Sequence, residues 1–340
     1  MKATERMYNF FKGKEIDRLP MLEWAPIWDL TYQRWMNEGL NIPFTYFARD
    51  WRKVQLELGL DANFQTYFPA RTPGVCPVAT THGAGLAKNE EEYEKLKPYM
   101  FADPERYISK EHLQWLKETR EAGDTVHWFT IEGFFWHPRE IFGIEDHLYS
   151  FYDEPELYHR MCEDYVEWIK KVVEFIGNTF RFDYMSIAED MSYNNGPMIS
   201  KDSFDEFLAP YYKKIIPLIQ SLDIPVMIDS DGDITKAVDW YAEVGANGMF
   251  PLERQAGVDV SLYLKKQPNM FFLGHFDKMC MKFGEEAMRQ EFERLYPSML
   301  SGKFIPSVDH QTPPDVSLEN YRIYTKLFKE YIERAAKEIR

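Results

Sequence analysis

Acidic side chains and two histidines stand at the ends of most apolar, strand-like runs of this sequence. The set comprises Glu23, Glu132, Glu189, Asp190, Asp229, Asp231, Glu253, His275, Asp277, Asp309 and His310. Carboxyl groups that share one recessed pocket repel one another, which raises their pKa values unless protons, cations or a metal ion offset the charge. Groups of this kind can protonate a leaving group, accept a proton or hold a metal ion.

Each of these residues also has an ordinary structural alternative. Asp229 can cap the helix that follows it, and Asp277 with Lys278 can form an ion pair. Either His275 or His310 can simply hydrogen-bond a neighbouring carboxylate. The clustering at so many strand ends, rather than any one residue, favours an active site.

The elements that must position these residues alternate along the chain between short β-rich runs and longer amphipathic segments. Strands are predicted at 182–190, 224–230, 245–253, 269–277 and 303–310, with helices between them at 200–222, 233–245, 258–267 and 285–300 and a closing helix at 317–337. The first half supplies strands at 18–26, at 61–68 or 77–83, and at 125–133, with helices at 44–59 and 155–177. This alternation predicts a (β/α)8 TIM barrel with an N-terminal extension, in a single domain over 1–340. The carboxyl ends of its strands would then gather the acidic residues on one face.

Composition excludes several classes of function. The formal charge of −15, with no cluster of Lys and Arg, argues against nucleic-acid binding. No apolar run is long enough to span a membrane and no signal peptide is evident. The 3 cysteines are far apart, so neither a disulfide framework nor a thiolate zinc site is indicated, and we expect a cytoplasmic protein.

Large aromatic side chains are frequent in the first seventy positions. Examples are Trp24, Trp28, Tyr46 and Tyr67. They fit core packing, or a lid that stacks on a flat organic substrate.

Five stretches of the chain resemble one known family. They are ERMYNFFKGKEIDRLPM near the start, EDMSYNNGPMISKDSFDEFLAPYYKKI, NGMFPLE at 247–253, GHFDK, and IPSVDHQTPPDVSLENY. Over nearly its whole length the chain resembles the uroporphyrinogen decarboxylase superfamily, which includes the haem-pathway decarboxylase and corrinoid-linked methyltransferases. The resemblance implies a TIM barrel and one of these two activities.

Two departures from the family patterns narrow the expected function. Decarboxylases of uroporphyrinogen carry an arginine-rich segment after the first strand, whereas this chain has LEWAPIWDL with Glu23 and Asp29, which would repel a polyanion. Zinc enzymes of the coenzyme M branch carry an H-x-C motif, which falls here at Asp229-Ser230-Asp231, while a later cysteine falls near Asp309. Carboxylates thus replace the soft ligands that thiol activation favours.

What remains resembles enzymes that demethylate a small donor and pass the methyl group to a corrinoid protein. The resemblance implies a methoxylated aromatic donor and a corrinoid (cobalamin) carried by a partner protein. Breaking an aryl ether leaves a poor phenolate, which must be protonated or bound to a metal. The resemblance does not decide whether the protein binds zinc or another divalent metal, or whether it forms a homodimer. The rival hypotheses are a decarboxylase of uroporphyrinogen or another carboxylated small molecule, and a non-catalytic accessory protein that binds a corrinoid or another tetrapyrrole.

The expected roles follow from this resemblance together with the strand ends. The predicted catalytic residues are Glu189, Asp190, Asp229, Asp231 and His310. The predicted substrate-binding residues are Glu23, Trp24, Trp28, Glu132, Tyr193, Glu253 and His275, with His137 as a further candidate. The predicted metal ligands are Asp229, Asp231, Asp309 and His310.

Overall fold

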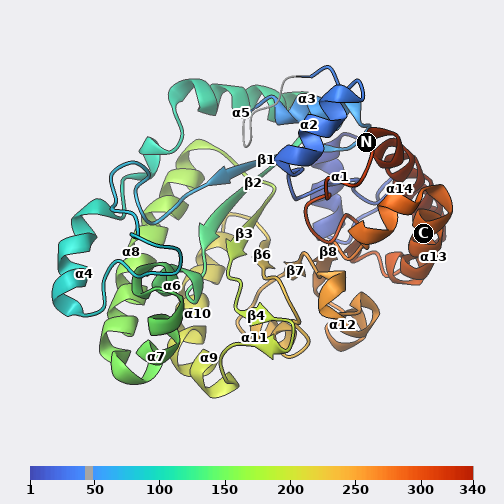
Figure 1. The fold of residues 1–340 in the computed structure, drawn as a ribbon. Helices are drawn as coiled ribbons and strands as arrows, with labels where there is room; N and C mark the ends of the chain where they lie inside the picture. The colour runs from blue at the N-terminus through green and yellow to red at the C-terminus, as the bar shows by residue number, and fades with distance from the viewer. Residues whose placement is uncertain (43–48, 340) are drawn as a thin grey trace.

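The computed structural model describes residues 1–42 and 49–339. Its centre is a curled parallel sheet in the order β1-β2-β3-β6-β7-β8-β9 (Figure 1). The strands are β1 (Ala62–Tyr67), β2 (Thr125–Glu132), β3 (Tyr184–Ala188), β6 (Val226–Asp229), β7 (Gly248–Phe250), β8 (Phe271–Leu273) and β9 (Phe304–Ile305). A separate antiparallel hairpin follows β3 and pairs β4 (Ser192–Tyr193) with β5 (Gly196–Pro197).

Helices connect the strands and cover the outside of the sheet. Before β2 come α1 (Ala3–Phe11), α2 (Asp29–Asn37), α3 (Trp51–Glu57), α4 (Glu90–Leu96) and α5 (Lys110–Ala122). Between β2 and β6 come α6 (Trp136–Phe142), α7 (Ile144–Asp153), α8 (Pro155–Thr179), α9 (Lys201–Phe207) and α10 (Ala209–Gln220). The rest are α11 (Ala237–Glu243), α12 (Val260–Lys266), α13 (Glu285–Met299) and α14 (Leu318–Ile339), with 3-10 turns η1 (Lys97–Tyr99), η2 (Pro104–Arg106), η3 (Arg254–Ala256) and η4 (Lys278–Phe283). None of these described helices is long and apolar enough to cross a membrane.

The described residues form seven strands in this sheet, not the expected eight. The segment predicted as the first strand, 18–26, joins no backbone ladder. It still lies between the two edge strands, because the Asp61 N–H donates to the Met21 carbonyl (2.9 Å) and the Val308 N–H donates to the Glu23 carboxylate (3.2 Å). The sheet is therefore curled, with side-chain and single backbone contacts across the gap in place of a continuous ladder.

Two other expectations change in detail. The helix predicted at 200–222 is broken into α9 and α10 at Leu208, because Pro210 in the first turn of α10 cannot donate a backbone hydrogen bond. Of the two alternatives for the second strand, residues 62–67 form β1 and residues 77–83 form no strand. The helix predicted at 44–59 is seen only as α3, since residues 43–48, Tyr46 among them, lie outside the described residues.

The inner face of the sheet is layered. Aromatic rings fill the amino end, where Phe11 of α1 packs on Tyr184 (5.9 Å between centroids) and on Phe271 (5.0 Å). Above them a polar row crosses three strands: the Gln65 amide donates to the Thr130 hydroxyl (2.7 Å), which bonds the Ser186 hydroxyl (2.7 Å). The N-terminal extension thus closes the amino end of the sheet, and the polar side chains lie toward the carboxyl end.

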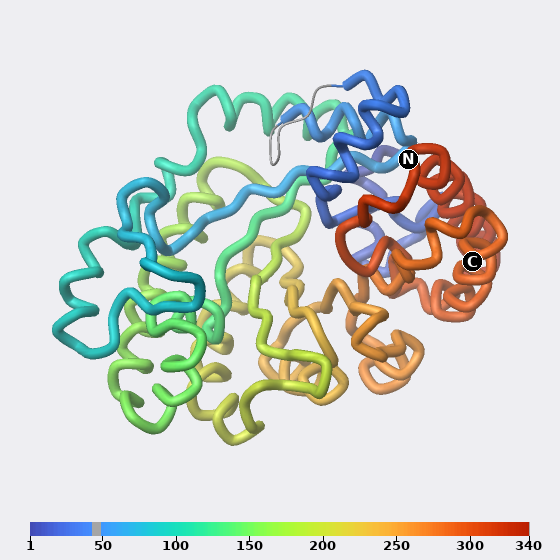
Figure 2. The backbone as a smooth tube through the Cα atoms, viewed as in Figure 1, coloured from blue at the N-terminus to red at the C-terminus, as the bar shows by residue number. Residues whose placement is uncertain are grey.

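The two ends of the chain meet on one side of the molecule (Figure 2). Trp35 of α2 packs on Tyr321 of α14 (4.5 Å between centroids), and its indole N–H donates to the Val316 carbonyl (2.9 Å). These contacts help to hold the first and last segments around the gap in the sheet.

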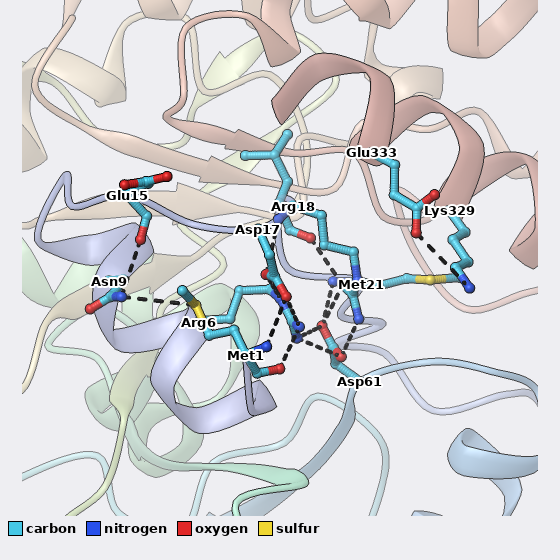
Figure 3. A network of polar contacts seen from close by, with 11 residues as sticks. Met1, Arg6, Asn9, Glu15, Asp17, Arg18, Met21, Asp61, Lys329 and Glu333 are labelled. Atoms are coloured by element: carbon cyan, nitrogen blue, oxygen red, sulfur yellow. Dashed lines mark hydrogen bonds and ion pairs between the residues drawn. The ribbon is translucent and has the colours of Figure 1, made fainter. Parts of the chain in front are cut away.

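A buried ion network fixes the N-terminal extension to the start of β1 (Figure 3). The Asp61 carboxylate accepts hydrogen bonds from Arg6 (3.1 Å), Arg18 (2.7 Å) and the Met21 N–H (2.8 Å). Arg6 also binds Asp17 (2.7 Å). Burial alone would raise the pKa of Asp61, but the hydrogen bonds and charges of Arg18 and Arg6 outweigh it and lower that pKa. The network therefore contributes stability only while Asp61 is ionised.

Removing this charge tests the network. We expect Asp61→Asn to lower the free energy of unfolding by about 3–5 kcal/mol, because two arginines lose their buried partner. Asp50→Asn, which breaks an exposed pair with Lys53 (2.9 Å), serves as the control and should cost under about 1 kcal/mol. Urea unfolding measures both. The difference should shrink as the pH falls below about 4, where the carboxyl becomes protonated in the unfolded chain and then in the folded one; equal losses at pH 7 would contradict the assignment.

Candidate active site

A cavity of about 220 Å³ opens at the carboxyl ends of the strands. It is lined by Trp24, Ala25, Pro26, Gln65, Asp190, Asp229, Asp231, His310 and Gln311. These residues come from the segment before α2, from β1, and from the ends of β3, β6 and β9. The structure therefore brings together five of the predicted site residues, Trp24, Asp190, Asp229, Asp231 and His310, on the expected face.

Three carboxyl groups meet on one wall of this cavity. The Asp190 carboxylate accepts a hydrogen bond from the Asp231 N–H (3.2 Å), and the Glu189 N–H donates to the Asp229 carbonyl (2.9 Å). Asp190 has a φ of 40°, a left-handed conformation that a non-glycine residue adopts only when its surroundings enforce it. The turn after β3 thus holds Asp190 beside the end of β6.

Burial and mutual repulsion raise the pKa values of all three groups. For Asp229 the pKa lies well above the usual value because of burial, then the charges of Asp190 and Asp231. Burial, followed by the charges of Asp190 and Glu253, raises the pKa of Asp231 to about 7. The pKa of Asp190 is raised as well, again mainly by burial. At neutral pH this wall therefore holds protons that ordinary carboxylic acids would have lost.

His310 stands next to Asp231 at the mouth. Its Nε2 lies 3.6 Å from the Asp231 carboxylate, and both side chains are partly exposed. Burial, followed by the charge of Lys278, lowers the pKa of His310, so its imidazole is neutral at pH 7. The Trp24 ring lies 5.8 Å from the imidazole, edge to face, and also packs on Phe250. The pair combines a proton donor and an acceptor beside an aromatic surface.

Lys278 supplies positive charge near this pair. Its Nζ lies 3.6 Å from Glu253 and 3.5 Å from Asp309, so it pairs with these residues instead of with Asp277. Asp277 instead caps the start of η4 by accepting from the Met279 N–H (2.9 Å). Lys278 holds the pKa values of Asp231 and His310 below what burial and the carboxylates would otherwise set.

The predicted metal ligands do not form a metal site as they lie. Asp309 is fully buried, and its two carboxylate oxygens accept from the Arg254 N–H (2.8 Å) and the Lys278 N–H (3.3 Å). In the part of the chain that the structure describes, no three His, Cys, Asp or Glu residues lie close enough together to hold a metal ion. A metal held by Asp229, Asp231, Asp309 and His310 stays a prediction that this arrangement does not support.

Three predicted site residues are buried cross-links instead of cavity walls. Glu23 accepts from the Val308 N–H and from the Tyr324 hydroxyl, and burial raises its pKa to about 8. Glu189 accepts from the Tyr212 hydroxyl and the Phe135 N–H at the start of α6, and burial raises its pKa to about 8. Both carboxyl groups fix the backbone around the site through these hydrogen bonds. They are adjacent in sequence to Trp24 and Asp190, which line the cavity, but they do not line it themselves.

His275 is the third buried cross-link. Its Nδ1 lies 3.0 Å from the Leu252 carbonyl, and its Nε2 lies 3.3 Å from the Val260 N–H at the start of α12. Burial lowers the pKa of His275 to about 4. The neutral ring joins the loops that follow β7 and β8 and does not reach the cavity.

Glu132 faces the inner side of the sheet but belongs to a neighbouring cluster. Tyr67 donates its hydroxyl proton to Glu132 (3.2 Å), and the His137 Nδ1 lies 3.3 Å from the same carboxylate. Trp28 and Tyr193 are exposed, and neither lines the cavity. Glu253 does not line the cavity, but it pairs with Lys278 and its charge raises the pKa of Asp231.

Sequence reasoning missed Gln65, Gln311 and the placement of Lys278. The position of Gln65 could have been predicted. Side chains alternate between the two faces of a strand, so Gln65 must lie on the same face of β1 as Asn63 and Tyr67. Gln311 carried no signal beyond following His310. The pairing of Lys278 could not be read from its neighbour Asp277, since the backbone turn sends the two side chains apart.

The role of Lys278 can be tested without any substrate. Lys278→Met should raise the pKa of His310, because a positive charge that disfavours the imidazolium is removed. The ring resonances of His310, assigned with His310→Asn and followed by NMR against pH, report that value. Lys282→Met is the control, since Lys282 pairs with Asp315 (2.9 Å) and should leave the titration unchanged. A downward shift, or equal shifts in both variants, would contradict the arrangement.

One solved structure shares the fold, and two others show a weaker likeness. A methyltransferase from Methanosarcina mazei superposes with a TM-score of 0.65 at 15% sequence identity, covering 97% of this chain and 99% of that one. A protein assigned as a vitamin-B12-independent methionine synthase from Listeria monocytogenes gives a TM-score of 0.45 at 13% identity, with 96% and 98% covered. A B12-independent methionine synthase from a Shewanella species gives 0.36 at 12% identity, with 67% of each chain covered.

Comparison of the sequence itself identifies the family. No curated protein matches the chain. The family model described as uroporphyrinogen decarboxylase (URO-D) matches residues 139–331, the region that runs from α6 into α14 and contains Asp190, Asp229, Asp231 and His310. The chain therefore belongs to the uroporphyrinogen decarboxylase family.

Proposed function

We propose that this protein is a methyltransferase that takes a methyl group from a small methylated donor, a methoxylated aromatic, and passes it to the Co(I) corrinoid of a partner protein. The observation that carries the proposal is the cavity wall on which Asp231 keeps a proton near pH 7 beside His310 and Trp24. The fold shared with the Methanosarcina mazei methyltransferase is consistent with it.

The reaction needs a nucleophile and an acid. The corrinoid, when bound to its partner, supplies the electron pair that forms the new bond to the methyl carbon. As the carbon–oxygen bond breaks, its electron pair stays on the ether oxygen, which becomes a phenolate unless it is protonated. The chain must therefore deliver one proton to that oxygen.

Asp231 is the residue best placed to deliver this proton. It is partly exposed in the cavity, and its pKa of about 7 leaves about half of the molecules protonated at neutral pH. Burial, followed by the charges of Asp190 and Glu253, holds the proton there, so Asp190 acts on Asp231 instead of on the donor. After transfer, the neutral His310 next to Asp231 can relay a proton from solvent.

The cavity suits a donor of about one ring. Its volume of about 220 Å³ is below the roughly 300–1,000 Å³ of pockets for drug-sized ligands. The Trp24 ring offers an aromatic face, and the Gln65 amide sits on the polar row below. A flat, neutral aryl ether would meet both without adding charge to the acidic wall.

A decarboxylase is the second candidate, and two observations favour it. The family is shown by the sequence, and Lys278 supplies a cation beside Asp231 that a substrate carboxylate could approach. Uroporphyrinogen itself fits poorly, because a polycarboxylate would face three carboxyl groups in a cavity of about 220 Å³. The decarboxylase candidate therefore requires a substrate that is a smaller carboxylic acid.

A donor screen separates the two candidates. Methoxylated aromatics, methylamines and small aromatic acids are incubated with the protein and reduced cobalamin, and products are identified by mass spectrometry while cobalamin absorbance is followed. Loss of one methyl group from a donor, together with consumption of the reduced cobalamin, is the expected result. Release of carbon dioxide from an acid with no demethylation would replace the methyltransferase by a decarboxylase.

Substitution of the acid gives the sharper prediction. For the donor found in the screen, Asp231→Asn should lower kcat by roughly 10²–10⁴-fold, because the amide cannot protonate the leaving oxygen. Asp233→Asn, in the same loop but bonded to Thr235, is the matched control and should keep wild-type kcat. The wild-type rate should be constant at low pH and fall as pH rises through about 7, since the raised pKa keeps the acid protonated only below that value. An Asp231→Asn enzyme with wild-type kcat would remove Asp231 from this role.

A further inference from the structure

Helix α7 carries apolar side chains on both of its faces. The inner face buries His147, Ser150 and Phe151. The outer face exposes a row that we call the α7 stripe. The α7 stripe consists of Ile144 (38% exposed), Leu148 (38%), Tyr149 (66%) and Tyr152 (78%). Residues four apart lie on the same side of a helix, so Ile144, Leu148 and Tyr152 form one line with Tyr149 beside it.

We infer that the α7 stripe is a docking surface for the corrinoid-carrying partner protein. The inference rests on the proposed function, because only methyl transfer to a protein-bound corrinoid requires such a partner. Exposed apolar patches of this kind mark interaction sites on soluble proteins.

Helix α7 is linked through its buried face to the frame of the cavity. On its inner side α7 packs His147 on Phe135 (4.5 Å between ring centroids). The Phe135 N–H donates to Glu189 (3.1 Å), the residue before Asp190 in the cavity wall. Helices α6 and α7 follow the carboxyl end of β2, and α7 lies at the edge of the molecule (Figure 1). A partner bound to the α7 stripe would thus rest on a helix that packs against the frame that positions Asp190.

The size of the stripe fits a transient partner. Its two tyrosines can bury roughly 300 Å² between them at these exposures. A stable interface needs roughly 800 Å² from each partner. A carrier that must leave after each methyl transfer requires a weak interface, and a permanent dimer does not.

Charge also argues against a second copy of this chain. The stripe is bordered by acidic residues, Glu145, Asp146, Asp153 and Glu156. Lys88 pairs with Asp146 (2.5 Å), which leaves the border net acidic. Two copies facing each other here would oppose like charges on chains of net charge −15. The complementary surface is apolar with lysine or arginine around it.

The test compares two acceptors of the methyl group. Tyr149→Asp/Tyr152→Asp and the control Leu262→Asp, an exposed residue of α12 (54%), are assayed with free reduced cobalamin and with a cobalamin-loaded corrinoid carrier domain. We expect the double variant to match wild type with free cobalamin. With the carrier domain its KM should rise roughly tenfold or more at unchanged kcat. The milder Tyr149→Ser/Tyr152→Ser variant repeats the test if the aspartates disturb folding, which circular dichroism reports.

The outcomes separate this inference from the proposed function. Free cobalamin that receives no methyl group from any donor refutes the proposed function, and with it the need for a carrier. Wild type that methylates free cobalamin but does not bind the carrier domain overturns the docking inference alone. An unchanged KM in the double variant does the same. A wild-type dimer in sedimentation that the double variant dissociates would assign the stripe to a second copy.

Discussion

Repulsion among carboxyl groups in a partly buried cavity is the constraint on which the site depends. Asp229 and Asp231 end one strand, and Asp190 follows its neighbour, so parallel pairing of β3 with β6 forces the three groups together. Burial, followed by the charges of Asp190 and Glu253, raises the pKa of Asp231 to about 7. A cluster of this kind costs stability, so the surrounding fold must hold it in place.

The holding groups are themselves acidic, which explains why so many strand ends carry carboxyls. Glu23 ties the segment before α2 to Val308 and Tyr324, and Glu189 ties the end of β3 to α6. Each has a pKa raised to about 8 by burial, yet each accepts two or more hydrogen bonds. Their function is mechanical: they fix the backbone from which Trp24 and Asp190 reach the cavity.

The sequence predicted most strands of the sheet correctly but did not predict the directions of their side chains. Alternation of apolar runs placed β3, β6, β7, β8 and β9 within the ranges predicted for them, and the strand ends led to Asp190, Asp229, Asp231 and His310. The sequence could not show that Asp190 lines the cavity while its neighbour Glu189 does not. The directions of the two side chains are set by the backbone turn, in which Asp190 has a φ of 40°. The prediction of a strand at 18–26 was wrong for a related reason. These residues have the composition of a strand, but they contact the two edges of the sheet largely through the side chains of Asp61 and Glu23.

The same geometry limits what the cavity can bind. An anion would face three carboxyl groups, and Lys278, the cation beside Asp231, already lies between Glu253 and Asp309. A cation would be attracted but would displace the protons that give Asp231 its acidity. A neutral donor leaves those protons in place and can use one of them. In the proposed reaction, the protonation state of the wall therefore selects the charge of the ligand as well as supplying the acid.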